Sequence, residues 1–463
     1  KKLVAEEKIA KLEGFGEKSQ ADILRAIEEF HQGYGKTTRM LLPFAVELAD
    51  SIVSYLKKHP AVKDAQPLGS LRRKLPTVGD IDIAVATDAP SEALEHFVAY
   101  PYKERVIEKG TASASIITSG GHQVDVMVQP TNSFGSLLQH FTGSKHHNIK
   151  LRDFALKKHL SLSERGMKHL DKNNEMTSYA TEESFYNALG MDWIPPEMRE
   201  DKGEIELAVK HALPELITLQ DIKGDLHIHS NYPIETSHDS GRDSMVEMLN
   251  HAHTLGYTYL GFSEHNPSVS RHTPEQITNI LKKRKDMIEK ISRNIKSVRI
   301  INLLEIDILA NDKLAIRESD FDYIDAGIVS IHSSFTMNAD AMTKRVLAGL
   351  SHPKVKILAH PTGRKLHGRS GISLQWDKIF DFCAKEKKAL EINAWPERTD
   401  LPDSLIYQAI KAGVKLVINS DSHAVSHMDL MKYGVYNARR GWATKADILN
   451  TMEYNRFIEW LKS

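Results

Sequence analysis

The sequence has little of what secreted or membrane proteins depend on. Its one cysteine, Cys383, excludes an intrachain disulfide framework and favours a reducing compartment. A lone cysteine also excludes thiolate-rich metal sites, so any metal must be held by nitrogen and oxygen ligands. No apolar run approaches the roughly 20 residues that span a bilayer. We therefore expect a cytoplasmic protein that does not associate with membranes.

A net charge is also lacking. The 61 basic and 61 acidic residues balance, so the total neither favours nor excludes a polyanionic partner. Residues 141–170 nevertheless hold seven Lys or Arg against two acids, although a solvated helix face explains such a run equally well. The 463 residues are too many for one hydrophobic core and predict about two to four domains.

From residue 223 onward, strand-like segments alternate with helical ones such as 274–296 and 401–412. This alternation predicts parallel strands joined by crossover helices. Seven strands are expected, within 225–230, 259–265, 299–308, 323–332, 356–361, 389–394 and 415–423.

Six of these seven strands end in residues that can bind a metal: His227, His229, Glu264, His265, Glu305, His332, His360, Asp421 and His423. The carboxyl ends of parallel barrel strands converge on one mouth. A single histidine is more often structural, but burying so many imidazoles and carboxylates together is costly unless cations organise them. The set suits Zn²⁺, Mn²⁺ or Fe, and clustered metals of this kind favour phosphoester hydrolysis by a bridging hydroxide.

The motifs "DLHIHS", "SEH", "LEIDIL", "SIH", "AHP" and "SDSH" resemble the PHP (polymerase and histidinol phosphatase) domain. The resemblance implies a distorted (β/α)₇ barrel with three metal ions. The first ion would be held by His227, His229, Glu305 and Asp421, and the second by Glu305, His332 and His360. His265 and His423 would hold the third together with Asp239. His238 is the alternative, because "HSNYPIETSHDSG" is longer than the corresponding family segment. Arg364 and Lys365 would contact the DNA backbone, or are ordinary surface cations.

A second carboxylate set lies near the start of the chain. In "VGDIDIAV", Asp80 and Asp82 alternate with isoleucines and share one face of a strand, and "HQVDVMV" offers Asp125. A bare Asp-x-Asp is more often the polar side of a half-exposed strand. Three carboxylates on adjacent strands, however, suit two Mg²⁺ ions that align a hydroxyl and a triphosphate. The nearby Gly69-Ser70 turn with Arg72 and Arg73 could bind the phosphates.

The pattern "GSLRR…VGDIDI" resembles the nucleotidyltransferase palm of family X DNA polymerases, and "HFTGSKHHNIKLR" is similar to their thumb entry. The resemblance implies triphosphate contacts from Ser70, Arg73 and Gly79. It also implies a nucleotide pocket shaped by Phe141 and Gly143, with Asn148 on the incoming base. His140 stands where the family usually has an aromatic residue, so the choice between ribose and deoxyribose stays open.

The segment "KLEGFGEKSQADIL" (11–24) resembles a helix-hairpin-helix, which would contact a DNA phosphate through Gly14, Gly16 and Lys18. A plain helix–helix turn is the alternative. In family X this is the second such hairpin. The lyase-like domain that precedes it is not found here, and we expect no excision of 5′-deoxyribose phosphate.

Together these motifs resemble the bacterial and archaeal family X DNA polymerases with a C-terminal PHP domain. The resemblance implies a multi-domain α+β and α/β fold, with fingers over 1–40, palm over 41–130 and thumb over 131–200. A linker over 201–222 and the barrel over 223–463 would follow. We expect a repair polymerase that adds dNTPs at gaps with Mg²⁺, and a 3′–5′ exonuclease with up to three Zn²⁺ or Mn²⁺ ions. Gapped or primer–template DNA would be the partner of a nucleoid-associated monomer. A small-molecule phosphoesterase with a vestigial palm and a non-catalytic DNA-binding scaffold are the alternatives.

Overall fold

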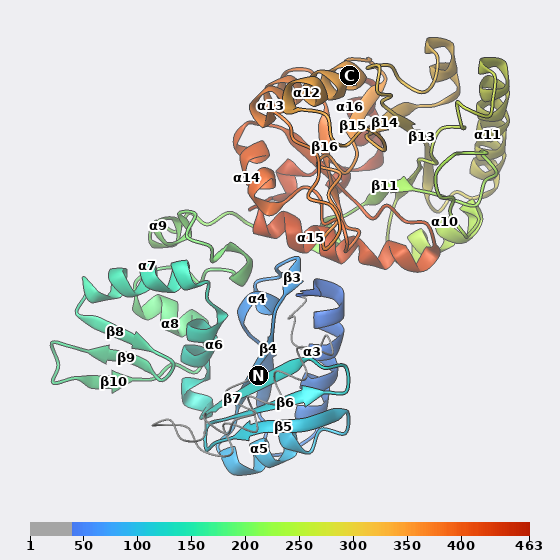
Figure 1. Cartoon of the computed structure of the whole chain (residues 1–463). Helices are drawn as coiled ribbons and strands as arrows, with labels where there is room; N and C mark the ends of the chain where they lie inside the picture. Colours follow the sequence, from blue (N-terminus) through green and yellow to red (C-terminus); the bar gives the residue numbers. More distant parts are fainter. Residues whose placement is uncertain (1–38) are drawn as a thin grey trace, which may run out of the picture. The chain divides into compact units, whose positions relative to one another are not determined.

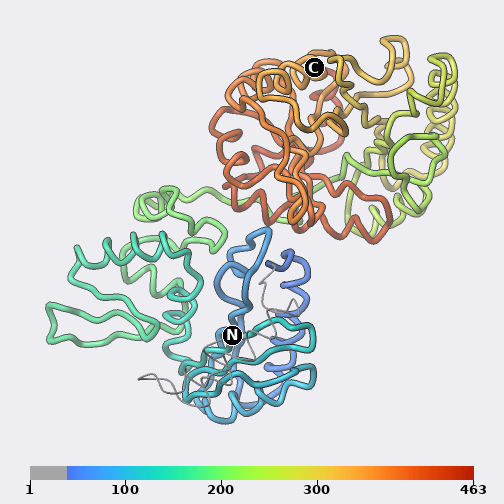
Figure 2. The backbone as a smooth tube through the Cα atoms, viewed as in Figure 1, coloured from blue at the N-terminus to red at the C-terminus, as the bar shows by residue number. Residues whose placement is uncertain are grey.

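The computed structural model describes residues 39–463 and divides into two compact units between Trp193 and Ile194 (Figure 1). The path of the chain through each unit can be followed in Figure 2. The hairpin residues Gly14, Gly16 and Lys18 lie outside the described residues. The boundary between the units falls inside the segment expected as thumb. The expected linker holds α9 (Glu204–Val209) and the short helix η3 (Leu219–Asp221).

A five-stranded sheet in the order β2-β4-β7-β6-β5 forms the centre of the N-terminal unit. Only β4 and β7 are parallel. The strands are β2 (Asp64–Pro67), β4 (Ile81–Ala86), β5 (Lys103–Lys109), β6 (Ser113–Thr118) and β7 (Gln123–Gln129). A separate ladder pairs β1 (Met40–Leu41) with β3 (Thr77–Val78). The strands β4 and β7 confirm that "VGDIDIAV" and "HQVDVMV" form adjacent strands.

Helices cover the sheet, and alternation along β4 decides which side each residue faces. The helices α3 (Leu42–Leu56) and α5 (Pro90–Val98) contact the sheet, as does α6 (Phe134–Thr142). Ala84 and Ala86 join Leu137 and Leu138 of α6 in one buried cluster. Asp82 has the same parity as these alanines, so its side chain lies on the α6 side of the sheet.

The remainder of this unit is a small α+β layer. It contains α7 (Lys145–Leu156), α8 (Glu182–Ala188) and an antiparallel sheet of β8 (Leu160–Ser163), β9 (Gly166–His169) and β10 (Glu175–Thr177). Ser144 and Thr181 begin the two helices by accepting a backbone N–H with their side-chain oxygens. The short helix η1 (Thr131–Ser133) precedes α6, and α4 (Gly69–Arg72) is tied to α8 by an Arg72–Glu182 ion pair of 2.6 Å.

Seven parallel strands in sequential order form the C-terminal unit, which confirms the predicted alternation. The strands are β11 (Gly224–Ile228), β12 (Tyr259–Phe262), β13 (Arg299–Asp307), β14 (Ala326–Ser330), β15 (Val355–Leu358), β16 (Ala389–Asn393) and β17 (Lys415–Asn419). The helices are α10 (Met245–Thr254), α11 (Pro274–Asn294), α12 (Ala339–Leu350), α13 (Trp376–Lys385), α14 (Asp403–Lys411), α15 (Met431–Arg440) and α16 (Tyr454–Lys462). The 3₁₀ helices are η2 (Pro196–Met198), η4 (Glu318–Tyr323), η5 (Val425–Leu430), η6 (Lys445–Asp447) and η7 (Leu449–Thr451).

The sheet closes almost completely into a barrel. Ile228 makes a parallel bridge to Ser422, and the His229 N–H donates to the Ser422 carbonyl over 2.8 Å. The Leu226 N–H donates to Asn419 Oδ1 over 3.0 Å. The first strand therefore lies beside the end of the last.

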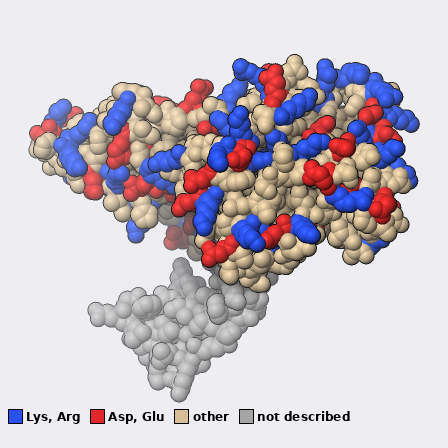
Figure 3. Space-filling model, turned by 90° about the horizontal axis from the view of Figure 1, so that it is seen from above, with Lys and Arg blue, Asp and Glu red and all other residues tan. Residues whose placement is uncertain are grey.

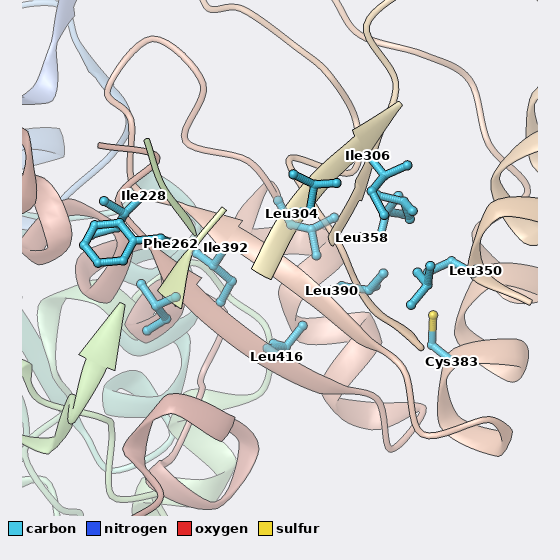
Figure 4. Close-up of a cluster of buried hydrophobic side chains, with 14 of the residues drawn as sticks. Ile228, Phe262, Leu304, Ile306, Leu350, Leu358, Cys383, Leu390, Ile392 and Leu416 are labelled. Atoms are coloured by element: carbon cyan, nitrogen blue, oxygen red, sulfur yellow. The ribbon is translucent and has the colours of Figure 1, made fainter. Parts of the chain in front are cut away.

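Strand alternation sorts the barrel residues into two apolar cores. Residues of one parity, such as Ile228, Leu304 and Ile392, pack against the surrounding helices, as Figure 4 shows. Residues of the other parity, such as Leu303 and Val417, pack with α16 and η7 inside the barrel. The inward positions are thus apolar at the amino ends of the strands and become polar toward their carboxyl ends.

The surface carries both signs of charge. On the face seen in Figure 3, Lys and Arg side chains are interspersed with Asp and Glu, in keeping with the balanced composition. Within residues 39–463, the helices all fall short of the length and apolarity that a transmembrane segment needs.

Candidate metal centre and nucleotide site

Three carboxylates meet on the palm-like sheet of the N-terminal unit. Asp82 and Asp125 lie opposite each other in the β4–β7 register, and Asp80 precedes β4 by one residue. Burial, together with the charges of Asp80 and Asp125, raises the pKa of Asp82 to about 7. Mutual repulsion of this kind is relieved when a divalent cation is bound between carboxylates.

The predicted phosphate-binding turn, which begins at Gly69, lies next to one of these carboxylates, Asp82. Gly69 has a φ of +55°, and a Cβ there would lie 3.2 Å from Asp82 Oδ2. Ser70 follows in α4, while Gly79 lies beside Arg39, whose Nη1 would be 3.3 Å from an added Cβ. The Arg73 guanidinium donates to the Thr142 carbonyl over 2.5 Å. Arg73 thereby joins the end of this turn to the start of the thumb-like segment.

The residues predicted to form the nucleotide pocket differ in how accessible they are. Phe141 is partly exposed at 37%, and a Cβ on Gly143 would lie 2.9 Å from Arg73 Nη1. Asn148 is buried, with its Oδ1 accepting from Gln139 over 3.0 Å and its Nδ2 donating to the His140 carbonyl over 2.7 Å. The structure thus places the Asn148 amide in bonds to the protein, and Phe141 and Gly143 are the more accessible members.

In the barrel, the predicted ligands converge at the carboxyl ends of the strands. The cluster is centred on Glu305, which is fully buried. Glu305 Oε2 lies 3.2 Å from His227 Nε2, 3.6 Å from His229 Nε2 and 2.8 Å from His265 Nδ1. Glu305 Oε1 lies 3.0 Å from His360 Nε2 and 3.5 Å from His332 Nε2. Asp421 Oδ1 reaches His229 Nε2 at 3.3 Å, which adds the last strand to the cluster.

The chemistry of these atoms fits metal ions. Among the described residues, five groups of three side chains could each hold an ion: His227–His229–Glu305, His227–His360–Asp421, Glu305–His332–His360, His229–His265–His423 and His238–His265–His332. Several buried atoms lie close to other ligand atoms but make no hydrogen bond of acceptable geometry in the described part of the chain: His227 Nε2, both ring nitrogens of His229, His265 Nδ1, Glu305 Oε2, His360 Nδ1 and His423 Nε2. Buried polar atoms are normally paired. Groups of ligand atoms that lie within 4.8 Å of one another, several of them without a hydrogen bond, are what divalent cations require.

Electrostatics support the same interpretation. Burial raises the pKa of Glu305, but the surrounding histidines outweigh it and hold that pKa well below the ordinary value. Burial lowers the pKa of His227, but Glu391 and the nearby ligand carboxylates raise it well above the ordinary value. The carboxylates therefore attract positive charge into the cluster, and a divalent cation would take the place of protons there.

The third ligand group includes both residues that the sequence left open. Asp239 places Oδ1 3.6 Å from His265 Nε2 and Oδ2 3.4 Å from His423 Nε2. His238 places Nε2 2.8 Å from Asp307 Oδ2, on the side of His332. Asp239 therefore has the geometry expected of the third ligand on the His265–His423 side, whereas His238 faces the second group.

Sequence reasoning missed Glu391 on the sixth strand. Its carboxylate is fully buried, lies 2.7 Å from His227 Nδ1, and accepts the His360 N–H over 2.6 Å. Asn393 and Asn419 also donate to it. The signal was the alternation in "ALEINA", which puts Glu391 on the same inward face as the ligands of the other strands.

Arg364 was predicted to contact DNA, but its guanidinium is directed into the protein. Nε donates to the Arg398 carbonyl over 2.9 Å, and Nη2 donates to the Thr399 carbonyl. Its neighbour Lys365 is exposed and lines the cavity above the ligands.

Comparisons with known proteins agree with this arrangement. Residues 137–200 match the DNA polymerase beta thumb family. The DNA polymerase/3'-5' exonuclease PolX of Bacillus subtilis (strain 168) is 34% identical over 467 residues, covering 100% of this chain and 79% of the relative. This chain belongs to the PolX family. Membership confirms the resemblance to family X polymerases, and the barrel after a polymerase-beta-like region confirms the expected fold class.

Proposed function

We propose that this PolX family member is a DNA repair polymerase that adds dNTPs at gaps and shortens 3′ ends with its barrel. The Bacillus subtilis relative, of which 79% is covered by the match, is named as a DNA polymerase and 3'-5' exonuclease. The observation that carries the second activity is the set of unpaired, buried histidine and carboxylate atoms at the barrel mouth.

For nucleotide addition, Asp80, Asp82 and Asp125 would hold Mg²⁺. When bound, Mg²⁺ supplies charge neutralisation for the triphosphate and the attacking 3′ hydroxyl. Ser70, Arg73 and Gly79 would bind the triphosphate, and Phe141 and Gly143 would shape the space for the sugar and base. The Arg73 bond to Thr142 supports this assignment, because it holds the phosphate-binding turn against the thumb-like segment.

For 3′-end shortening, the barrel would hold up to three Zn²⁺ or Mn²⁺ ions. The ligands would be His227, His229, Asp239, His265, Glu305, His332, His360, Asp421 and His423. When bound, such ions activate water and polarise a phosphodiester. The chain's own contribution is to hold the imidazoles in position. Glu391 does so for His227, and Asp307 does so for His332 over 2.7 Å.

The proposal includes the domain assignments 1–40, 41–130, 131–200, 201–222 and 223–463 as fingers, palm, thumb, linker and barrel. Gapped or primer–template DNA and dNTPs would be its substrates. A monomer acting in the cytoplasm on nucleoid DNA fits a repair role.

The test follows a 5′-labelled recessed primer–template with Mn²⁺, with and without dNTPs. We expect Asp80→Ala/Asp82→Ala to abolish extension and leave shortening, and His227→Ala/His229→Ala to do the reverse. Asp50→Ala and His253→Ala, at exposed positions of the two units, are the matched controls. Wild-type protein that neither extends nor shortens DNA would overturn the proposal, and a small phosphomonoester would then be tried as substrate.

A further inference from the structure

A cavity of about 340 Å³ opens above the predicted metal ligands of the barrel. It is lined by those ligands and by loops that follow the carboxyl ends of four strands. The lining residues that are not predicted ligands include Arg242, Lys365, Trp395, Arg398 and His427. This volume lies at the lower end of the usual range for small-molecule sites, so the cavity suits one mononucleotide unit better than a duplex.

Trp395 forms an aromatic wall of this cavity and is held in place from several directions. Its backbone N–H donates to Asn393 Oδ1 over 2.9 Å, and its backbone carbonyl accepts from the backbone N–H groups of Arg398 and Thr399, each over 2.8 Å. The Arg364 guanidinium donates to the Arg398 and Thr399 carbonyls and so holds the following residues of the same loop. The backbone that carries the indole is therefore fixed before any ligand binds.

His427 packs edge-on against this indole. The ring centroids of Trp395 and His427 lie 4.8 Å apart with an interplanar angle of 68°. His427 Nδ1 accepts the N–H of His423 over 3.2 Å, which orients the imidazole. This edge-to-face contact fixes the two rings relative to each other, and the partly buried indole lines the cavity.

Cationic side chains line the same cavity. Arg242 and Lys365 are exposed, and within residues 39–463 no ion pair of 4.0 Å or less joins either side chain to a carboxylate, while the exposed Glu397 also lines the cavity. Arg398 is partly buried, with Nε 3.5 Å from Asp421 Oδ2. An aromatic side chain beside two cations that make no ion pair is suited to a ligand with one planar group and one phosphate.

We propose that Trp395, Arg242 and Lys365 form a nucleotide subsite that binds the 3′-terminal nucleotide of the strand being shortened. The base stacks on Trp395, and the phosphate on the 5′ side of the terminal sugar and the next phosphate toward the 5′ end contact Arg242 and Lys365. This inference rests on the proposed exonuclease function of the barrel. Because every base has a π face, stacking accepts all four bases and rejects a terminal sugar without one.

The first experiment measures binding without turnover. The full chain carries Asp80→Ala/Asp82→Ala, so that the palm does not contribute, and dAMP and deoxyribose 5-phosphate are titrated by calorimetry with Mn²⁺ present. We expect Trp395→Leu to weaken dAMP binding about tenfold or more and to change deoxyribose 5-phosphate binding by less than about twofold. Lys365→Gln should weaken both ligands. Trp376→Leu, at a partly buried indole on α13, is the matched control for the tryptophan change.

The second experiment compares shortening rates on oligonucleotides that end in a normal nucleotide or in a 3′-terminal tetrahydrofuran residue. We expect the ratio of the two rates to fall about tenfold in Trp395→Leu and to stay constant in Trp376→Leu. An unchanged ratio together with unchanged dAMP binding would overturn the subsite. If wild-type protein shortens neither oligonucleotide yet binds dAMP through Trp395, the exonuclease proposal fails and the subsite stands as a mononucleotide site.

Discussion

At the scale of single residues, Glu391 shows how a carboxylate that need not touch a metal can decide whether a metal binds. It contacts the ring of His227, the backbone of His360 and, through Asn393, the carboxylate of Asp421. The Nδ1 contact requires His227 to present Nε2 to the cluster, which is the atom that lies unpaired there. Partners of this kind set the tautomer and basicity of a ligating histidine.

Glu391→Gln keeps the size of this side chain and removes its charge. We expect the barrel's affinity for Mn²⁺ to fall about 10- to 100-fold, and DNA shortening to fall with it while primer extension is unchanged. The metal affinity is measured directly by titration of the metal-free protein. Glu386→Gln, at an exposed position just before the same strand, should behave as wild type. An unchanged Mn²⁺ affinity in Glu391→Gln would show that the contact is only structural.

At the scale of elements, the mouth of the barrel is built from loops that hold one another. Asp400, in the loop after β16, is fully buried and accepts the N–H of Thr362 from the loop after β15 over 3.0 Å. The Leu366 N–H donates to the Glu397 carbonyl over 2.6 Å and adds a second link between these loops. The loop that carries Trp395 is therefore hydrogen-bonded to the loop after β15.

Asp400 makes this pair sensitive to pH. Burial raises the pKa of Asp400 to about 6, although Arg364 and the Thr362 bonds oppose the rise. Below about pH 4 the carboxyl is protonated in both the folded and the unfolded state. Between about pH 4 and 6 the unfolded chain releases this proton first, so the Asp400 contribution to the free energy of unfolding falls as the pH rises, and it levels off above pH 6.

Asp400→Asn retains an acceptor for the Thr362 N–H and lacks this titration. We expect the free energy of unfolding of the variant, relative to wild type, to rise by about 1–3 kcal/mol between pH 4 and pH 7. Urea unfolding of the barrel unit in EDTA, at intervals of one pH unit, measures this difference. A difference that stays constant over this range would contradict the assignment to Asp400.

At the scale of the whole molecule, two compact units carry two kinds of candidate cation site. The N-terminal unit has three carboxylates on a half-exposed sheet, which suit Mg²⁺. The C-terminal unit has a buried, histidine-rich cluster, which suits Zn²⁺ or Mn²⁺. Bound metal should stabilise chiefly the unit that holds it.

Removal of metal should therefore change one unfolding transition and not the other. With Mn²⁺ about a thousandfold above its dissociation constant, we expect the melting temperature of the barrel to lie about 8–16 °C above its value in EDTA. Scanning calorimetry measures both transitions in the same sample. His227→Ala/His229→Ala should abolish the difference, and Asp80→Ala/Asp82→Ala should preserve it. A shift shared equally by both transitions would argue against a metal centre confined to the barrel.

Much of the fold could be predicted from the sequence because its signals are local. Alternation of apolar residues located β4, β7 and the seven barrel strands, and each barrel strand overlaps its expected segment, although β11 and β15 begin one residue earlier. Residues at the carboxyl ends of those strands were recognised because parallel barrel strands all end at the same mouth. Glu391 faces inward like these residues and, like Glu305, precedes the end of its strand by two residues, but it was passed over.

The sequence by itself determined which residue types stand at the strand ends, since strand pattern and ligand chemistry depend on neighbours along the chain. Only the tertiary structure decided which of them come together. Asp239 meets His265 and His423, Arg364 is directed into a loop and away from solvent, and Trp395 faces the cavity. These arrangements join residues far apart in sequence through loop conformations. Loop conformations arise from hydrogen bonds and packing that no periodic pattern encodes.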